Sequence, residues 1–159
     1  MKNTSERYKV VYIAGPISGT TDYLERFKRA EEQLREDGYI PVNPTIVSEP
    51  LIAAGCEYEE FMRVTHELLR VCGAILLLCD WESSKGTLRE LTYALDNDYD
   101  IYCETSGHFY QTEVCPKCLL SFTSYNYGKK KAIHSHYCPS CGASLLPEGC
   151  EATETDLPT

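Results

Sequence analysis

Short apolar runs alternate with amphipathic segments over the first hundred residues of the chain. The runs have the length and the β-branched or aromatic content of buried strands, and they cover residues 8–14, 39–42, 74–79 and 100–103. Apolar residues recur at helical spacing in the segments 22–37, 58–72 and 86–95. The pattern of residues 45–56 is that of an irregular loop. This alternation predicts an α/β domain with a parallel sheet of about four strands and right-handed crossovers.

Length and charge divide the chain into three parts. With 159 residues, of which 43% are hydrophobic, the chain can form one core of ordinary size and a small module. We expect a flavodoxin-like or Rossmann-like domain over residues 1–106, a small module over 107–147 and a disordered acidic tail over 148–159. Their net charges are −8, +3 and −4. The acidic first domain is therefore a poor electrostatic match for a nucleic-acid backbone.

Two Cys-x-x-Cys pairs stand in the 107–147 module. Cys115 and Cys118 form the first pair, Cys138 and Cys141 form the second, and 19 residues separate the pairs. This spacing is typical of structural zinc sites, in which four thiolates close a tetrahedral shell and leave no position open for catalysis. The pattern predicts a zinc ribbon with one structural zinc. Four cysteines without a metal are the alternative.

The ribbon also carries a cluster of basic side chains. Lys129, Lys130 and Lys131, with tyrosines and histidines nearby, suit a weak contact with nucleic acid or with a protein. A solvated hairpin explains the same residues. No apolar run reaches the length that crosses a bilayer, and the N-terminus is too polar for a signal peptide. We therefore expect a cytoplasmic protein with no membrane contact.

Polar segments follow three of the predicted strands. They are YIAGPISG at residues 12–19, VNP at 42–44 and DWESSKGTLRE at 80–90. The carboxyl ends of parallel strands meet at one edge of a sheet, where ligands collect. Together and in this order, the segments resemble the nucleoside 2-deoxyribosyltransferase-like superfamily, which includes the deoxynucleoside-monophosphate N-glycosidases. The closest resemblance is to an uncharacterised branch common in phages and bacteria, and it covers about residues 8–103.

The resemblance implies cleavage of the N-glycosidic bond of a nucleoside 5′-monophosphate, or deoxyribosyl transfer, through a glutamate nucleophile. By motif position the nucleophile is Glu90, and Tyr12 matches the tyrosine that orients it. A carboxylate can attack C1′ and form a glycosyl ester, as in retaining glycosidases. The resemblance also implies a homodimer and a set of substrate-binding positions: Gly15, Ile17, Ser18, Gly19, Asn43, Asp80, Trp81, Ser84 and Gly86.

Two positions depart from the pattern of the resembled family and leave other functions open. Thr65 and Gly73 stand where relatives usually carry aspartates, and His66, Glu67 or Asp80 are candidates to compensate. A protein that binds a nucleotide or nucleotide-derived signal without cutting it is therefore the main alternative. In a third reading the ribbon mediates an interaction, and the α/β domain is its scaffold. Without a ligand, the glycines and serines of the motifs are ordinary turn and cap residues.

Overall fold

The computed structural model describes residues 9–114 and 121–123. Packing divides the chain into two compact units, one ending at Tyr110 and the other beginning at Gln111. The acidic tail and the four cysteines of the predicted zinc site, Cys115, Cys118, Cys138 and Cys141, lie outside the described residues. The first unit contains the residues of the predicted active site.

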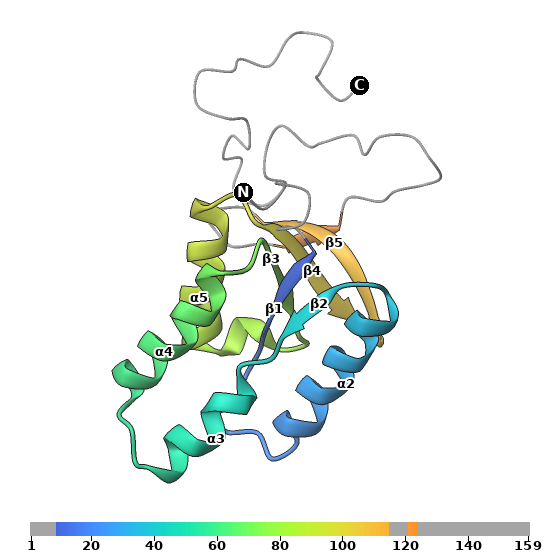
Figure 1. Cartoon of the computed structure of the whole chain (residues 1–159). Coiled ribbons are helices and arrows are strands. Elements are labelled where there is room, and N and C mark those ends of the chain that lie inside the picture. The colour runs from blue at the N-terminus through green and yellow to red at the C-terminus, as the bar shows by residue number, and fades with distance from the viewer. Residues whose placement is uncertain (1–8, 115–120, 124–159) are drawn as a thin grey trace, which may run out of the picture. The chain divides into compact units, whose positions relative to one another are not determined.

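Strands and helices alternate along the first unit, as the sequence predicts. The elements are β1 (Val10–Ala14), α2 (Tyr23–Glu36), β2 (Ile40–Val42), α3 (Thr45–Ala53), α4 (Tyr58–Arg70), β3 (Ala74–Leu77), a 3-10 turn (Trp81–Ser83), α5 (Lys85–Asp96), β4 (Asp100–Thr105) and β5 (His108–Val114). The sheet order is β2-β1-β3-β4, followed by β5 (Figure 1). β1 pairs in parallel with both β2 and β3, and β3 pairs in parallel with β4. The prediction of an α/β domain with a parallel sheet is confirmed.

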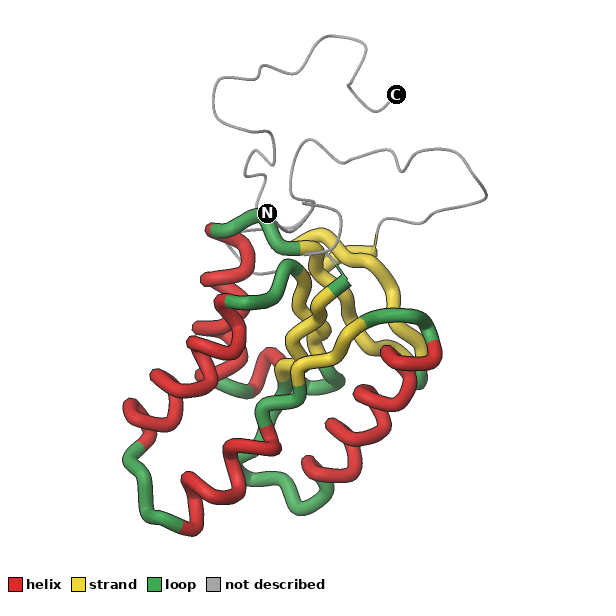
Figure 2. The backbone as a smooth tube through the Cα atoms, viewed as in Figure 1, coloured by secondary structure: helices red, strands yellow, loops and turns green. Residues whose placement is uncertain are grey.

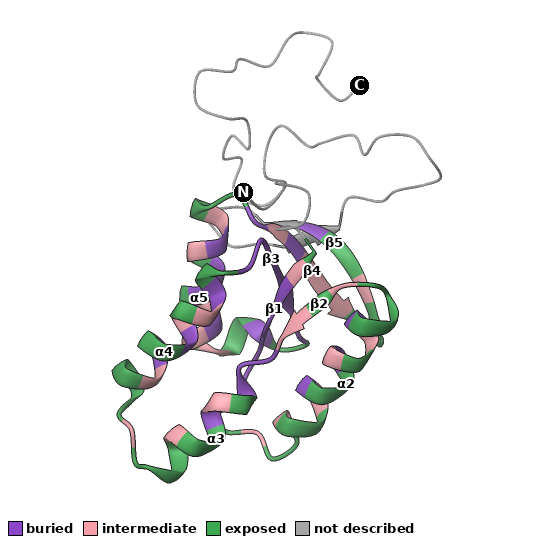
Figure 3. Ribbon diagram, viewed as in Figure 1, coloured by how far each residue is buried: buried purple, intermediate pink, exposed green. Residues whose placement is uncertain are grey.

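Helices cover both faces of this sheet. α2 lies on one face, and α4 and α5 lie on the other, so the strands run between two helical layers (Figure 2). Successive side chains of a strand point to opposite faces. Val11 and Ile13 accordingly pack with Phe27 of α2, whereas Tyr12 between them reaches Glu90 of α5. β1 and β3 are buried on both faces (Figure 3), which explains their continuous apolar sequences.

Two elements differ from the sequence prediction. Residues 45–53 form helix α3 and not a loop. Asn43 fixes its start, because its side-chain oxygen accepts hydrogen bonds from the backbone N–H and the hydroxyl of Thr45 at 3.0 and 2.7 Å. Pro50 lies inside the helix and has no backbone N–H to donate to the preceding turn. The second difference is β5, which lengthens the sheet beyond the four predicted strands and begins in the segment predicted as ribbon.

The second unit is described only over Gln111–Val114 and Ser121–Thr123. Its end of β5 pairs antiparallel with β6 (Ser121–Thr123), with Thr112 opposite Thr123 and Val114 opposite Ser121. Across the described part of the chain, no helix has the length and apolar character needed to cross a membrane.

Candidate active site

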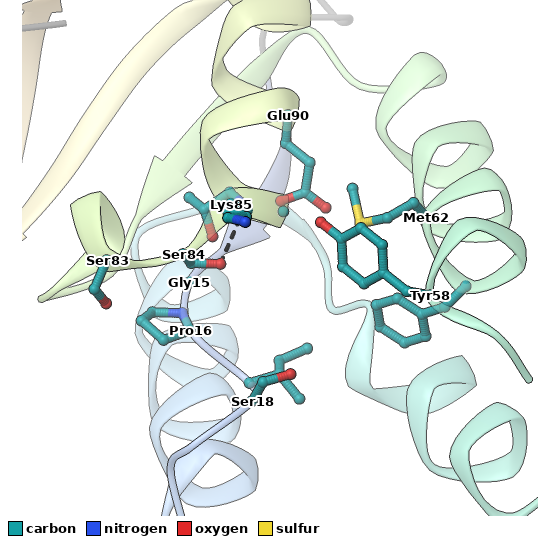
Figure 4. A pocket seen from close by; sticks show the side chains of 13 residues that line it. Gly15, Pro16, Ser18, Tyr58, Met62, Ser83, Ser84, Lys85 and Glu90 are labelled. Carbon is teal, nitrogen blue, oxygen red and sulfur yellow. Dashed lines mark hydrogen bonds between the residues drawn. The ribbon is translucent and has the colours of Figure 1, made fainter. Parts of the chain in front are cut away.

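The strand order brings the ends of β1 and β3 together. The chain leaves β1 toward β2 on one side and reaches β3 on the other, so the neighbouring carboxyl ends of β1 and β3 form the switch point of the sheet, where ligands bind in open α/β folds. A pocket of about 540 Å³ lies there (Figure 4). Its lining comes from the loop after β1, from α4 and from the start of α5: Gly15, Pro16, Ile17, Ser18, Tyr58, Phe61, Met62, Ser83, Ser84, Lys85, Gly86, Thr87 and Glu90.

A buried carboxylate forms part of the pocket wall. α5 begins at Lys85 because the Ser84 side chain caps it, accepting a hydrogen bond from the backbone N–H of Thr87 at 3.2 Å. Glu90 follows in the second turn and is only 7% exposed. The hydroxyl of Tyr12, fully buried on β1, donates a hydrogen bond of 2.6 Å to Oε1 of Glu90. The pocket therefore contains a carboxylate whose orientation is fixed by a buried donor.

Burial changes the protonation behaviour of both partners. It raises the pKa of Glu90 from its ordinary 4.5 to about 7, although the hydrogen bond from Tyr12 acts in the opposite direction. Burial also raises the pKa of Tyr12 well above 10, and the nearby Glu90 carboxylate raises it further. The phenol therefore stays protonated as a donor at neutral pH, while Glu90 titrates close to neutrality. A carboxyl group tuned in this way is typical of catalytic sites.

Thr65 lies beside this pair. Its side chain is buried, and its hydroxyl donates a hydrogen bond of 3.3 Å to the backbone oxygen of Met62. The neighbouring Thr65 side chain also lowers the pKa of Tyr12, so the threonine lies close to the phenol. Thr65, the position at which the resemblance implies an aspartate, therefore lies beside the Tyr12–Glu90 pair. In this chain it contributes a neutral hydroxyl and no second carboxylate.

The candidates to compensate for the missing aspartate lie elsewhere. His66 packs edge-on against Tyr93, with ring centroids 4.5 Å apart. Glu67 forms a surface ion pair of 3.3 Å with Arg70. Asp80 lines a different cavity, on the side of α2. None of the three belongs to the lining of the pocket that contains Glu90. Gly73, the second departure, donates its backbone N–H to Val10 at 3.1 Å and joins the sheet.

Two glycines of the motifs lie where an added Cβ atom would come very close to a neighbouring side chain. A Cβ atom on Gly15 would lie 3.0 Å from Cβ of Leu78, so the Leu78 side chain would have to shift to make room for it. A Cβ on Gly86 would lie 3.2 Å from Sδ of Met62 and 3.6 Å from the hydroxyl oxygen of Tyr58. Gly86 therefore lets side chains of α4 approach the first turn of α5.

The predicted substrate-binding residues separate into two groups. Five of the nine line the pocket, as the predicted nucleophile Glu90 also does: Gly15, Ile17, Ser18, Ser84 and Gly86. Four others do not: Gly19, Asn43, Asp80 and Trp81. The Asn43 side chain bonds Thr45 at the start of α3 and donates to Glu31 at 2.9 Å, so it holds the loop between β2 and α3. Trp81 is only 4% exposed and packs in the core, which differs from the substrate-binding role that the resemblance implies.

Sequence reasoning missed the side of the pocket that α4 provides. Tyr58, Phe61 and Met62 line it, together with Lys85 and Thr87 of α5. The periodicity of α4 assigns Phe61 and Met62 to an apolar face, and it does not distinguish a core from the wall of a pocket. The position of Gly86 was the available signal, because a glycine in the first turn of a helix often permits a close approach.

Thr87 gives a prediction about stability. Its side chain is 1% exposed, and its hydroxyl oxygen has no hydrogen-bond partner among the described residues. Replacing Thr87 with valine keeps the shape and removes the unpaired hydroxyl, so we expect the free energy of unfolding to rise by about 1 kcal/mol. Chemical denaturation of both proteins measures this difference.

Thr65→Val is the matched control, because the Thr65 hydroxyl is also buried but is hydrogen-bonded to Met62. This variant should lose about 1 kcal/mol of stability. A Thr87→Val protein destabilised as much as Thr65→Val would show that the Thr87 hydroxyl does have a partner.

Comparisons with known proteins identify the family. Neither the curated proteins nor the solved structures gave a match to this chain. A family model described as "Domain of unknown function (DUF4406)" matches residues 9–102, which is more than half of the chain. The matched segment contains every residue that lines the pocket, and Tyr12 as well. The chain therefore belongs to the DUF4406 family.

Proposed function

We propose that this protein cleaves the N-glycosidic bond of a nucleoside 5′-monophosphate, or transfers its deoxyribosyl group, in the pocket at the ends of β1 and β3. The observation that carries the proposal is the buried Glu90 carboxylate, which accepts a 2.6 Å hydrogen bond from Tyr12 and has a pKa of about 7. The resemblance of the three motif segments to nucleoside 2-deoxyribosyltransferase-like proteins supports the same chemistry.

The proposed reaction has two displacement steps. The ionised Glu90 attacks C1′ of the sugar, a glycosyl ester forms, and the bond from C1′ to the base breaks with its electron pair leaving on the base. The base takes up a proton from water. A water molecule, or a second base in the case of transfer, then attacks C1′, gives up a proton to the solvent and releases the Glu90 carboxylate. Tyr12 keeps the carboxylate oriented and stabilises its charged form.

The lining suits the two ends of a nucleotide. Ile17, Phe61 and Met62 offer apolar surface for a base. Ser84 and Lys85 stand at the start of α5, where backbone N–H groups and the helix dipole favour an anion. A phosphate at this end would place the sugar between the helix start and Glu90.

Release of free base tests this function. The full-length protein is incubated with the four deoxynucleoside and the four ribonucleoside 5′-monophosphates, and the products are separated by chromatography. We expect free base and sugar 5-phosphate in equal amounts from at least one nucleotide. Addition of a second base distinguishes transfer from hydrolysis, because transfer yields a new nucleotide.

Non-catalytic nucleotide binding is the second candidate function. The observation that favours it is Thr65, which lies beside Tyr12 at the position where the resemblance implies an aspartate and supplies no acidic group. A binding protein would retain nucleotides in the same pocket and release no base from any of them. The same incubation, combined with a binding measurement, separates the two functions.

For the C-terminal module we propose one structural zinc per chain, held by Cys115, Cys118, Cys138 and Cys141. Four thiolates in two Cys-x-x-Cys pairs are a donor set that closes a tetrahedral zinc site. Metal analysis of protein prepared without chelator should find one zinc per chain. Cys138→Ser should release it and unfold the module, because zinc binding also stabilises the fold of a ribbon.

Cys56→Ser is the control for this prediction, since Cys56 lies in the first unit. It should retain the zinc. Protein that contains no zinc, or a Cys138→Ser variant that retains it fully, would contradict the assignment.

A further inference from the structure

Tyr58 presents its hydroxyl group beside the first turn of α5. The residue opens α4, whose start is fixed by a capping box between Glu57 and Glu60. The side chain lines the pocket, and its hydroxyl oxygen lies 3.6 Å from the point where a Cβ of Gly86 would be (Figure 4). Gly86 and Glu90 are four residues apart on one face of α5. The phenol therefore faces the pocket about one helical turn before the carboxylate.

An arginine that is paired with a glutamate contacts the Tyr58 side chain. The guanidinium carbon of Arg89 lies 5.9 Å from the centre of the Tyr58 ring, and Arg89 donates to Glu59 at 3.1 Å. The pKa of Arg89 is raised chiefly by Glu59, and a hydrogen bond with Tyr58 raises it further. Arginine has donors only, so the Tyr58 oxygen accepts in this contact. The phenolic proton remains available for an acceptor in the pocket.

Backbone donors gather next to the phenol. The first backbone hydrogen bond inside α5 runs from the N–H of Leu88 to the oxygen of Ser84 at 3.0 Å. The N–H groups of Lys85 and Gly86 precede it and have no acceptor within the helix. An anion placed there would meet these two groups, the Lys85 ammonium and the Tyr58 hydroxyl. Among the residues that line the pocket, Glu90 is the one carboxylate, and it lies one turn further along α5. It can accept a hydrogen bond from a sugar hydroxyl but would repel a phosphate.

We propose that Tyr58 determines the specificity of the pocket for phosphorylated ligands, by donating a hydrogen bond from its hydroxyl to the 5′-phosphate of a bound nucleotide. This inference rests on the proposed nucleotide site and adds a residue from α4 to it. Arg89, which is paired with Glu59, holds the orientation of the phenol. The pocket then selects nucleoside monophosphates over nucleosides through a contact that a nucleoside cannot make.

Tyr58→Phe tests the contact, because it keeps the ring under Arg89 and removes only the hydroxyl. Binding is measured in full-length protein that also carries Glu90→Gln, so that ligands are not consumed. The probes are the four deoxynucleoside 5′-monophosphates and the four matching nucleosides. We expect Tyr58→Phe to weaken monophosphate binding about tenfold, the order of one hydrogen bond to a charged group, and to leave nucleoside binding within about twofold.

Tyr23→Phe is the matched control, since the Tyr23 hydroxyl bonds Glu49 on the surface and lies outside the pocket. It should change neither affinity. Equal monophosphate affinity with and without the Tyr58 hydroxyl would overturn the inference, as would an equal loss for monophosphates and nucleosides, or no binding of monophosphates at all. Base release by protein with an intact Glu90 is scored separately. If base is released but Tyr58→Phe shows no phosphate-selective loss, the proposed function stands and the role of Tyr58 is wrong. If the phosphate-selective loss is found but no base is released, the role of Tyr58 stands and the proposed catalysis is wrong.

Discussion

Glu90→Gln should lower the rate of base release at least about a thousandfold, while nucleotide affinity changes little. The amide keeps the shape of the side chain and can still accept the hydrogen bond from Tyr12. It lacks the negative charge that forms the bond to C1′ and stabilises positive charge developing there. Because this interaction exists chiefly in the transition state, the loss appears in turnover, at about 4 kcal/mol of barrier.

Glu82→Gln provides the matched control for this measurement. Glu82 lies in the 3-10 turn between β3 and α5, is exposed and does not line the pocket. Its amide variant should turn over nucleotides at the rate of the unmodified protein. A Glu90→Gln protein that releases base as fast as the unmodified protein would exclude Glu90 as the nucleophile.

Tyr12→Phe should shift the pH dependence of base release to higher pH. The reaction needs ionised Glu90, so the rate should rise with pH through the Glu90 pKa, near 7. The Tyr12 hydrogen bond lowers that pKa, and its removal should therefore raise the midpoint of the acid limb. Loss of one hydrogen bond to a charged group corresponds to about one pH unit, or about tenfold in rate at pH 6.

Tyr99→Phe is the control for the pH profile. Tyr99 is also buried, and its hydroxyl donates to the backbone oxygen of Leu69 at 2.9 Å, away from Glu90. Its variant should lose stability and keep the midpoint of the unmodified protein. A Tyr12→Phe profile with an unchanged midpoint would mean that the phenol does not control ionisation of Glu90.

The central strands could be predicted from the sequence because strands that are buried on both faces consist almost entirely of apolar residues. β1 and β3 lie between two helical layers, so all their residues are apolar or nearly so, and periodicity in α2, α4 and α5 marks the faces that cover them. Helix α3 gave no such signal. Most of its apolar residues are exposed, as Ile46 is at 71%, and Pro50 lies within it.

The site residues that belong to sequence motifs could be predicted. The residues that reach the pocket only through tertiary contacts could not. Glu90 and Tyr12 were found by motif, and the parallel sheet explains how residues 78 positions apart meet. The raised pKa of Glu90 follows from burial, which a sequence does not give. Tyr58 belongs to a third segment, and only the close approach of α4 to Gly86 assigns it to the pocket.

Covalent trapping tests the central claim most directly. A nucleoside 5′-monophosphate with a 2′-fluoroarabinosyl sugar slows the second displacement, because fluorine destabilises positive charge at C1′, and the glycosyl ester should accumulate. After acid quenching, mass spectrometry should find one fluorosugar phosphate per chain, on the peptide that contains Glu90, and none in Glu90→Gln. Base release without an adduct, or an adduct on another residue, would contradict Glu90 as the nucleophile of this pocket.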